Sequence, residues 1–518
     1  MNRGPLLPTL LLSFLALAVP AAHAEVKLPK IFSSHMVLQR NKPIHIWGWS
    51  DVGEKVSATL NNVTETTTGD ELGHWSLYLP PQSAGGPFQL KVAGTSTVSL
   101  DDVLIGDVWF ASGQSNMEMP LSGFPGSAVV NNAAAEIRDA NHPTIRLFTV
   151  ERKTSEFPLN DFTGDEAWQV CSPETAAKFS AVAYFFGRDL AAREHVPIGL
   201  IDSSWGGTPG AAWVSLDALS SDASLMPVFA AQAELVEHQA DTPAIIAKEK
   251  REDAAVRAAN RTPVPRAWHP PDLASWRPAA LFNGMVAPAV PFSIEGVIWY
   301  QGESDSSRSR AFVYKRVFPT LISDWRTHWR EGNFPFLFVQ IANYKSTGLE
   351  TWPIVREAQR KTLVLRNTAM AVTIDIGNPD NVHPADKQSV GARLALAARA
   401  LAYGENVEYS GPLFRQTSTA EAGLRVWFDH VDGGLTVKGN SLEGFEIAGE
   451  DHHFVPATAR VDGSSVLVSS PQVERPQYVR YGWANAPVVN LYNAEGLPAS
   501  PFTSEDQENA IAAPPLGK

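Results

Sequence analysis

The feature that most constrains the fold of this chain is an alternation of short apolar runs with helical periodicity, which extends from about residue 101 to 405. The apolar runs suit strands that are buried on both faces, and the intervening segments have the 3.6-residue period of amphipathic helices. Such alternation is typical of βαβ units and a parallel sheet, so the sequence predicts an α/β domain. The predicted strands are Val108–Ala111, Pro197–Ile201, Gly296–Tyr300, Phe336–Ile341 and Ala369–Ile374, and the predicted helices are Ala183–His195, Tyr314–Trp329, Pro353–Arg366 and Pro384–Tyr403.

β-strand patterns flank this α/β region on both sides. Alternating runs such as Ile44–Trp49 and Trp75–Leu79 occur within residues 25–100, and similar runs such as Leu424–Phe428 return within residues 406–518. Because chain ends often lie close together in space, we expect the two β-rich segments to pack against each other.

A stretch of different composition interrupts the α/β region between residues 222 and 280. Ala230–Asn260 is rich in Ala, Glu, Lys and Arg and is predicted to be helical, whereas Thr262–Pro278 is rich in proline and tryptophan. We interpret the stretch as an insertion over the α/β domain. Two alternatives stay open: a lid or wall beside a site, or a surface excursion with no role in one.

The first 24 residues have the pattern of a secretory signal peptide. Arg3 supplies the positive charge, Leu6–Val19 the apolar run, and Ala22–Ala24 an A-x-A cleavage site. We therefore expect an exported protein, periplasmic or secreted, that is not held in a membrane after cleavage. The formal net charge of −13 argues against nucleic acid and anionic membrane surfaces as partners.

A serine follows the first strand of the α/β region. Val108–Ala111 runs into the small polar turn Ser112–Asn116, which contains Ser115. A serine at the carboxyl end of a strand is exposed at the rim where α/β sheets bind ligands, and it is well placed to be a nucleophile. The same residues also form ordinary tight turns, so this motif alone leaves both interpretations open.

An aspartate and a histidine, Asp380 and His383, follow the last predicted strand. At this spacing the Asp380 carboxylate can accept a hydrogen bond from one imidazole nitrogen, while the other nitrogen takes a proton from a nucleophile. An N-capping aspartate and a surface histidine are the alternative. Together with the strand-end Ser115, the chain order Ser…Asp…His favours a catalytic triad.

Two further strand ends carry groups that can stabilise an oxyanion. Gly206 and Gly207 follow Pro197–Ile201, and Gln301, with its side-chain amide, follows Gly296–Tyr300. Because the carboxyl ends of parallel strands share one rim, we expect these groups to lie near Ser115.

These blocks resemble the sialate O-acetylesterase family of SGNH-type serine hydrolases. The resemblance covers most of the chain after residue 24 and is carried by Phe32–Arg40, Gly113–Met117, Ser203–Thr208, Ile298–Ser304, Asp380–Lys387 and Val479–Pro498. It implies a flavodoxin-like α/β/α three-layer domain joined to a jelly-roll-like β-sandwich built from the N- and C-terminal segments. It also implies an enzyme, a carbohydrate O-acetylesterase.

The resemblance assigns roles to individual residues. Ser115 matches the nucleophile, His383 the general base and acid, and Asp380 the group that orients the histidine. The implied oxyanion donors are the backbone N–H of Ser115, the N–H of Gly207 in preference to that of Gly206, and the side chain of Gln301, where the broader SGNH pattern has asparagine. Two supporting residues are Asn116, which is expected to pin the serine turn, and Glu303, because related acetylesterases use a glutamate at this position to support the histidine.

The expected reaction needs no metal and no cofactor, since neither metal-ligand spacing nor a cofactor motif is present. A structural Ca²⁺ at the acidic loop Asp429–Gly434 stays an alternative. The expected substrate is an acetylated oligo- or polysaccharide, with a plant cell-wall polymer such as xyloglucan slightly preferred. The alternatives are a sialate 9-O-acetylesterase, a small-ester hydrolase unconnected to sugars, and a non-catalytic carbohydrate-binding protein.

Overall fold

The computed structural model describes residues 25–237, 241–264, 273–346, 351–421 and 423–505. The proposed signal peptide and part of the proline-rich stretch lie outside these ranges. Within them, every helix is too short or too polar to cross a membrane.

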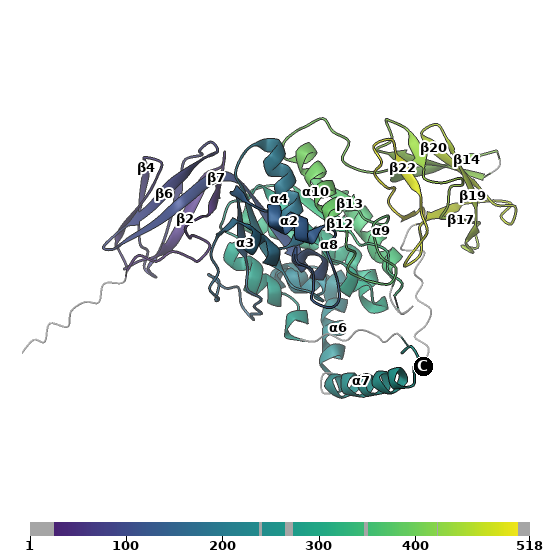
Figure 1. Ribbon diagram of the computed structural model, residues 1–518, viewed down its shortest axis with the longest axis horizontal. Helices are drawn as coiled ribbons and strands as arrows, with labels where there is room; N and C mark the ends of the chain where they lie inside the picture. The colour runs from purple at the N-terminus through teal and green to yellow at the C-terminus, as the bar shows by residue number, and fades with distance from the viewer. Residues whose placement is uncertain (1–24, 238–240, 265–272, 347–350, 422, 506–518) are drawn as a thin grey trace, which may run out of the picture.

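A parallel sheet forms the centre of the molecule (Figure 1). Its strand order is β13-β12-β11-β7-β10-β8, with the short β9 added antiparallel at one edge. Without β8 and β9, the order from the other edge is β10-β7-β11-β12-β13. Numbered along the chain, these strands have the order 2-1-3-4-5, which is that of flavodoxin-like sheets. The strands are β7 (Thr97–Gly113), β8 (His142–Thr149), β9 (Gln169–Cys171), β10 (Ile198–Ser204), β11 (Gly296–Tyr300), β12 (Phe336–Gln340) and β13 (Thr368–Val372).

Helices cover both faces of this sheet. Successive side chains of a strand point to opposite faces, so a strand that is apolar throughout needs cover on both. Trp109 and Ala111 of β7 belong to the hydrophobic cluster under α4 (Ala181–Glu194) and α10 (Lys387–Leu401). Val108 and Phe110 belong to the cluster under α8 (Arg308–Trp329) and α9 (Trp352–Thr362). The central layers therefore are helix, sheet and helix, and β7 is apolar on both faces.

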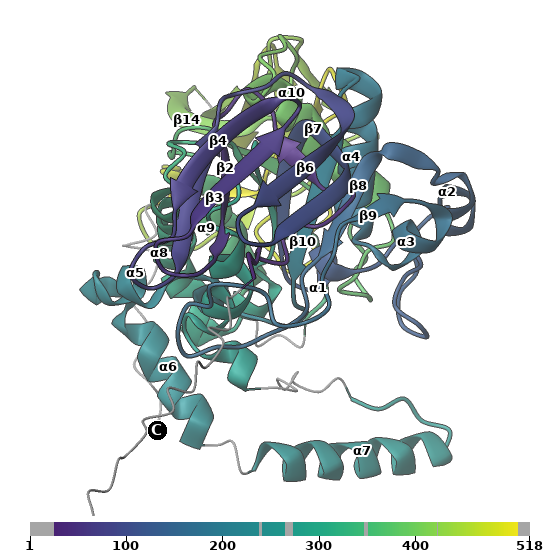
Figure 2. The same ribbon diagram turned by 90° about the vertical axis from the view of Figure 1, so that its left-hand side faces the viewer.

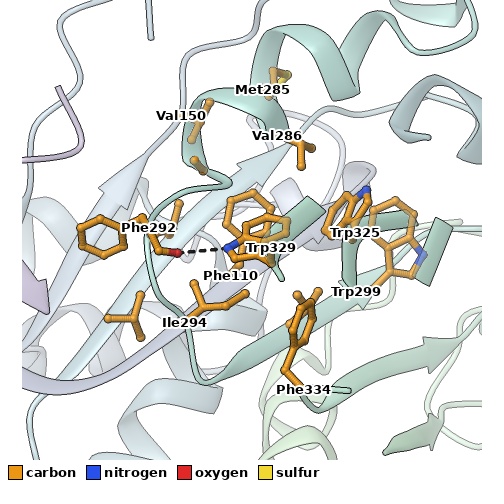
Figure 3. Packing of buried hydrophobic residues seen from close by; sticks show 14 of the residues in the cluster. Phe110, Val150, Met285, Val286, Phe292, Ile294, Trp299, Trp325, Trp329 and Phe334 are labelled. Atoms are coloured by element: carbon orange, nitrogen blue, oxygen red, sulfur yellow. Dashed lines mark hydrogen bonds between the residues drawn. The ribbon is translucent and has the colours of Figure 1, made fainter. Parts of the chain in front are cut away.

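Aromatic side chains fill the second of these clusters (Figure 3). The ring of Phe110 packs edge-on against Trp325 at 5.6 Å and Trp329 at 5.4 Å. The indole N–H of Trp329 donates to the carbonyl of Phe292 at 3.0 Å, so this buried polar group is satisfied. This packing anchors β7, the strand that ends at the serine turn.

The N-terminal strands form a separate β-rich unit at one end of the molecule (Figure 1). The long strand β7 belongs to both parts: its first half pairs with β6 and β1, and its second half pairs with β10 and β11. The other strands of the unit are β1 (Val37–Gln39), β2 (Ile44–Trp49), β3 (Lys55–Leu60), β4 (Val63–Thr68), β5 (His74–Leu79) and β6 (Gly85–Ala93).

The C-terminal strands form another β-rich unit at the opposite end (Figure 1). They make small antiparallel sheets with the orders β14-β15-β20-β19, β18-β17-β21-β23 and β16-β22. Their bounds are β14 (Leu413–Ala420), β15 (Gly423–Asp429), β16 (Leu435–Val437), β17 (Phe445–Ala448), β18 (Val455–Pro456), β19 (Thr458–Asp462), β20 (Ser465–Ser469), β21 (Tyr478–Tyr481), β22 (Leu491–Asn493) and β23 (Phe502–Thr503).

The prediction that the two β-rich segments pack together as one sandwich is therefore wrong. The α/β domain lies between them, because β7 continues directly from the N-terminal unit into the central sheet (Figure 1). The C-terminal unit instead docks on α9 through Arg356, which is fully buried. Its guanidinium donates to the carbonyls of Ile341 and Ala342 at 2.9 and 2.8 Å and to those of Ala484 and Asn485, each at 2.8 Å.

The insertion at residues 222–280 contains α6 (Met226–Glu237) and α7 (Thr242–Ala258). Figures 1 and 2 show α7 standing away from the α/β domain. None of its described residues is buried, which explains its charged, alanine-rich sequence. The remaining helices are short: α1 (Ser115–Glu118), α2 (Ala133–Asp139), α3 (Pro173–Lys178) and α5 (Leu216–Ser220).

Candidate active site

The serine turn begins where β7 ends. Gly113 lies in the sheet with a φ of +136°, and the N–H of Gln114 donates to the carbonyl of Tyr300 at 2.9 Å. Ser115 is then the first residue of α1. Because N–H groups in the first turn of a helix have no intrahelical acceptor, the N–H of Ser115 is available to a ligand. No acceptor for it occurs among the described residues.

The histidine predicted to be the base meets this serine. Nε2 of His383 lies 2.9 Å from Oγ of Ser115, although 268 positions separate them in the chain. The ring of Phe124 packs edge-on against the imidazole at 5.2 Å. Burial, with a smaller contribution from the charge of Lys387, lowers the pKa of His383 to about 4. The imidazole is therefore neutral at pH 7 and can accept a proton from Ser115.

Asp380 is not where the sequence predicted it. Its side chain is 80% exposed, and its carboxylate lies 3.4 Å from Nζ of Lys345. Within the described part of the chain, no hydrogen bond joins it to His383. The reason is the shape of the loop: the N–H of Asp380 donates to Oδ1 of Asn378, and that of His383 donates to Oδ1 of Asn381, each at 2.9 Å. These two turns direct the aspartate to solvent and the histidine to Ser115.

This geometry predicts a small effect of Asp380→Asn on catalysis. The loss of an orienting carboxylate from a Ser-His-Asp triad lowers kcat by roughly 10⁴-fold. We expect kcat/KM of Asp380→Asn on a chromogenic acetate ester to fall less than about tenfold, because the side chain is solvated. A loss near the triad value would show that Asp380 turns inward in the working enzyme.

The predicted glycine turn lies beside Ser115. A Cβ built on Gly206 would lie 2.6 Å from Oε2 of Glu118 and 3.2 Å from Cβ of Ser115, so this close approach favours glycine. The N–H of Gly206 donates to Oε2 of Glu118 at 2.8 Å. Gly207 has a φ of +74°, and its N–H has no acceptor among the described residues. Of the two glycines, Gly207 is thus the one with a free donor.

Gln301 is not available as an oxyanion donor, and this prediction is corrected. The residue is fully buried, and its Nε2 donates to the carbonyl of Thr208 at 3.2 Å and to Asp305 at 2.6 Å. Its Oε1 accepts from the hydroxyl of Tyr314 at 3.1 Å. Both amide protons are therefore used inside the protein, where they hold the turn after β11.

The two predicted supporting residues contact each other. Nδ2 of Asn116 donates to Oε1 of Glu303 at 2.6 Å and to the carbonyl of Val382 at 3.0 Å. Asn116 therefore joins the serine turn to the residue that precedes His383. No hydrogen bond connects Glu303 with His383 in the described structure, and Oε2 of Glu303 is buried without a partner there. Glu303 therefore contacts the serine turn through Asn116.

Three residues of the site were not predicted from the sequence. Oε1 of Gln114 accepts the N–H groups of Gly302 and Ser304 at 3.3 and 3.1 Å, which connects the turns after β7 and β11. Glu118 holds the glycine turn, as described above. Lys387 donates to Oδ1 of Asn116 at 2.5 Å. Gln114 and Glu118 lie within three positions of Ser115, and that proximity was the available signal.

A tryptophan and an arginine lie next to the glycine turn. The guanidinium of Arg152 lies 5.9 Å from the ring centroid of Trp205 and pairs with the carboxylate of Glu118. Both side chains are partly exposed. They therefore form a surface beside Ser115 that a substrate can contact. Among the described residues, no group of three or more His, Cys, Asp or Glu side chains is arranged to hold a metal ion.

Comparisons with known proteins identify the family of this chain. A family model described as a carbohydrate esterase, sialic acid-specific acetylesterase, matches residues 262–400. The chain is 31% identical to the sialate O-acetylesterase of Mus musculus over 98% of this chain and all of that protein, and 31% identical to that of Homo sapiens over 91% of each. A crystal structure of a carbohydrate acetylesterase from Xanthomonas citri is 36% identical, with a TM-score of 0.80 over 93% of this chain and all of that one. The chain belongs to the sialate O-acetylesterase family of carbohydrate acetylesterases.

Proposed function

We propose that this protein removes O-acetyl groups from a neutral oligo- or polysaccharide through an acetyl-enzyme on Ser115. The observation that carries the proposal is the 2.9 Å contact between Oγ of Ser115 and Nε2 of a neutral His383, next to two backbone N–H groups that have no acceptor among the described residues. A nucleophile, a base and oxyanion donors are the groups that acyl transfer needs.

The reaction has two steps. Nε2 of His383 takes the proton of the Ser115 hydroxyl while Oγ attacks the acetyl carbonyl carbon. The tetrahedral oxyanion accepts the N–H groups of Ser115 and Gly207, and the loss of one such donor costs roughly 10²- to 10³-fold in kcat. His383 then donates its proton to the sugar oxygen as the acetyl C–O bond breaks. In the second step, His383 deprotonates a water that attacks the acetyl-enzyme, and acetate leaves as Ser115 regains its proton.

The surroundings of Ser115 favour a neutral sugar over sialic acid. Arg152 would be a counter-ion for a sialate carboxylate, but its charge is already paired with Glu118. Trp205 is partly exposed, and an aromatic ring can stack on a sugar ring. The net charge of −13 also disfavours anionic ligands. We therefore retain a plant cell-wall polymer such as xyloglucan as the proposed substrate, with a 9-O-acetylated sialate as the alternative.

The proposal is tested with equal acetyl concentrations of acetylated xyloglucan, xylan, mannan and 9-O-acetylated sialic acid, and acetate release is measured. We expect kcat/KM to be at least about tenfold higher on one neutral polysaccharide than on the sialate, because the paired Arg152 gives no gain with the carboxylate. A higher value on the sialate would overturn the substrate assignment. Absence of acetate release from all of them and from a chromogenic acetate would favour the non-catalytic alternative.

We also propose that the protein is exported. The support is the N-terminal sequence pattern, which lies outside the described residues. A polysaccharide is met outside the cytoplasm, so this location fits the proposed substrate.

A further inference from the structure

A buried lysine that the proposed mechanism does not use lies behind the serine turn. Lys387 is the first residue of α10 and is fully buried. Its Nζ lies 5.5 Å from the ring centroid of Tyr300, which is also buried. Because burial of an ammonium is costly unless it is paired, the position requires specific partners.

The partner of Lys387 is the side chain that joins the two catalytic segments. Its Nζ donates to Oδ1 of Asn116 at 2.5 Å, and Nδ2 of Asn116 donates to Glu303 at 2.6 Å and to the carbonyl of Val382 at 3.0 Å. Asn116 follows the nucleophile directly, and Val382 precedes the base directly. One carboxamide thus fixes the Ser115 turn against the His383 loop.

Charge determines which way this carboxamide faces. An ammonium can only donate hydrogen bonds, and a carboxylate can only accept them. While Lys387 is an ammonium and Glu303 a carboxylate, the oxygen of Asn116 must face the lysine and its NH₂ group must face Glu303 and Val382. If the lysine is replaced by an apolar side chain, nothing holds the amide oxygen, and the NH₂ group can leave the Val382 carbonyl.

We propose that Lys387 is a positioning residue for the esterase reaction: it orients the carboxamide of Asn116, which holds His383 within hydrogen-bonding distance of Ser115. This inference rests on the proposed roles of Ser115 and His383. No contact between Lys387 and substrate is involved, since the side chain lies behind the turn. The arrangement also gives the buried Glu303 its function, as the acceptor on the opposite side of the carboxamide.

The charge of Lys387 has a second, measurable consequence. It is faced by Glu303 from the turn after β11, by Asp386 at the start of its own helix, by His383 from the preceding loop and by Tyr300 of β11. Burial lowers the pKa of Lys387 to about 7, and Glu303 and Asp386 oppose this shift. Near pH 4 the ammonium is charged, and it disfavours protonation of His383, whose lowered pKa follows mainly from burial and in addition from Lys387.

The test compares Lys387→Met with wild type and with the exposed Lys91→Met of β6. We expect kcat on a chromogenic acetate to fall by about 10- to 100-fold in Lys387→Met with KM changed less than threefold, and to stay unchanged in Lys91→Met. His383 must be neutral to act as base, so kcat/KM of the wild type declines as the pH falls through about 4. In Lys387→Met this decline should move to higher pH, towards the ordinary histidine pKa of about 6.5.

A merely structural role of Lys387 would lower the yield of folded protein and leave kcat of the folded fraction unchanged. Unchanged kcat in folded Lys387→Met overturns the proposal, whether or not the pH profile moves. If Lys387→Met does not fold, Asn116→Asp provides the test, because a carboxylate at this position cannot donate a hydrogen bond to the carbonyl of Val382. A tenfold or larger loss of kcat in Asn116→Asp supports the proposal, and full activity overturns it. Activity that survives in Ser115→Ala would instead refute the proposed function, so the two failures are distinguishable.

Discussion

Ser115→Ala is expected to lower kcat on acetate esters by roughly 10⁴- to 10⁶-fold, which is the loss seen when a serine hydrolase loses its nucleophile. The methyl group of alanine cannot form the acetyl-enzyme, and the remaining catalysis would come from substrate binding and the oxyanion donors. Only the side-chain hydroxyl is removed, and Ser115 is half-buried, so the fold should persist. The measurement is steady-state hydrolysis of a chromogenic acetate, together with thermal unfolding.

Ser122→Ala is the matched control. Ser122 is an exposed serine seven positions further along the chain, and its N–H, which donates to the carbonyl of Ala177 at 3.0 Å, is kept by alanine. Its kcat should equal that of the wild type. Incubation with an acetate ester should leave an acetyl group on wild-type Ser115 during turnover and none on Ser115→Ala. A Ser115→Ala protein that retains a tenth of wild-type kcat would refute the nucleophile assignment.

The central sheet was predictable because its strands are buried on both faces and read as continuous apolar runs. Val108–Ala111 and Gly296–Tyr300 coincide with the part of β7 and with the strand β11 that adjoin the site. The predicted helix at Pro384 begins later, at Lys387, because the side chain of Asp386 accepts the N–H of Ser389 and caps the helix there. The strand β8 was not predicted, since its first residues are polar and contain a proline.

The relative position of the two β-rich ends could not be derived from local patterns. A strand pattern states which residues face a core but not which core they enter. Here β7 passes from the N-terminal unit into the central sheet. Leu104, which pairs with Val37, and Trp109, which pairs with Gly296, lie in this one continuous strand. In the sequence, the second half of this strand is an apolar run, and no pattern indicates that the residues before it belong to the same strand.

The site was predictable where topology alone decides the geometry. Ser115, the glycine turn and His383 follow strand ends of a parallel sheet, and such ends meet at one rim. Asp380 and Gln301 were assigned by spacing and by resemblance. Their orientation depends on hydrogen-bond partners, of which some are distant in the chain and others lie in the same turn. Asn378 and Asn381 turn Asp380 outward.

The largest expected effect on stability is that of Gly113→Ala, at the end of β7. A φ of +136° is costly for any residue with a Cβ, and the added Cβ would lie 2.1 Å from the carbonyl oxygen of Tyr300, where backbone cannot give way without breaking the sheet. Backbone strain of about 1–2 kcal/mol and overpacking of about 1–3 kcal/mol together predict a loss of about 3–5 kcal/mol in the free energy of unfolding. Urea unfolding followed by tryptophan fluorescence measures it.

Gly126→Ala separates the two causes of this loss. Gly126 also has a positive φ, +72°, but no atom lies within 4 Å of a Cβ built on it. It should therefore lose only the strain of about 1–2 kcal/mol and keep wild-type kcat. The fraction of Gly113→Ala that folds should have greatly reduced kcat, because the carbonyl displaced by the new Cβ also accepts the N–H of Gln114, next to the nucleophile. Equal losses of stability in the two variants would mean that Tyr300 moves aside, and that the serine turn is not held by close packing against β11.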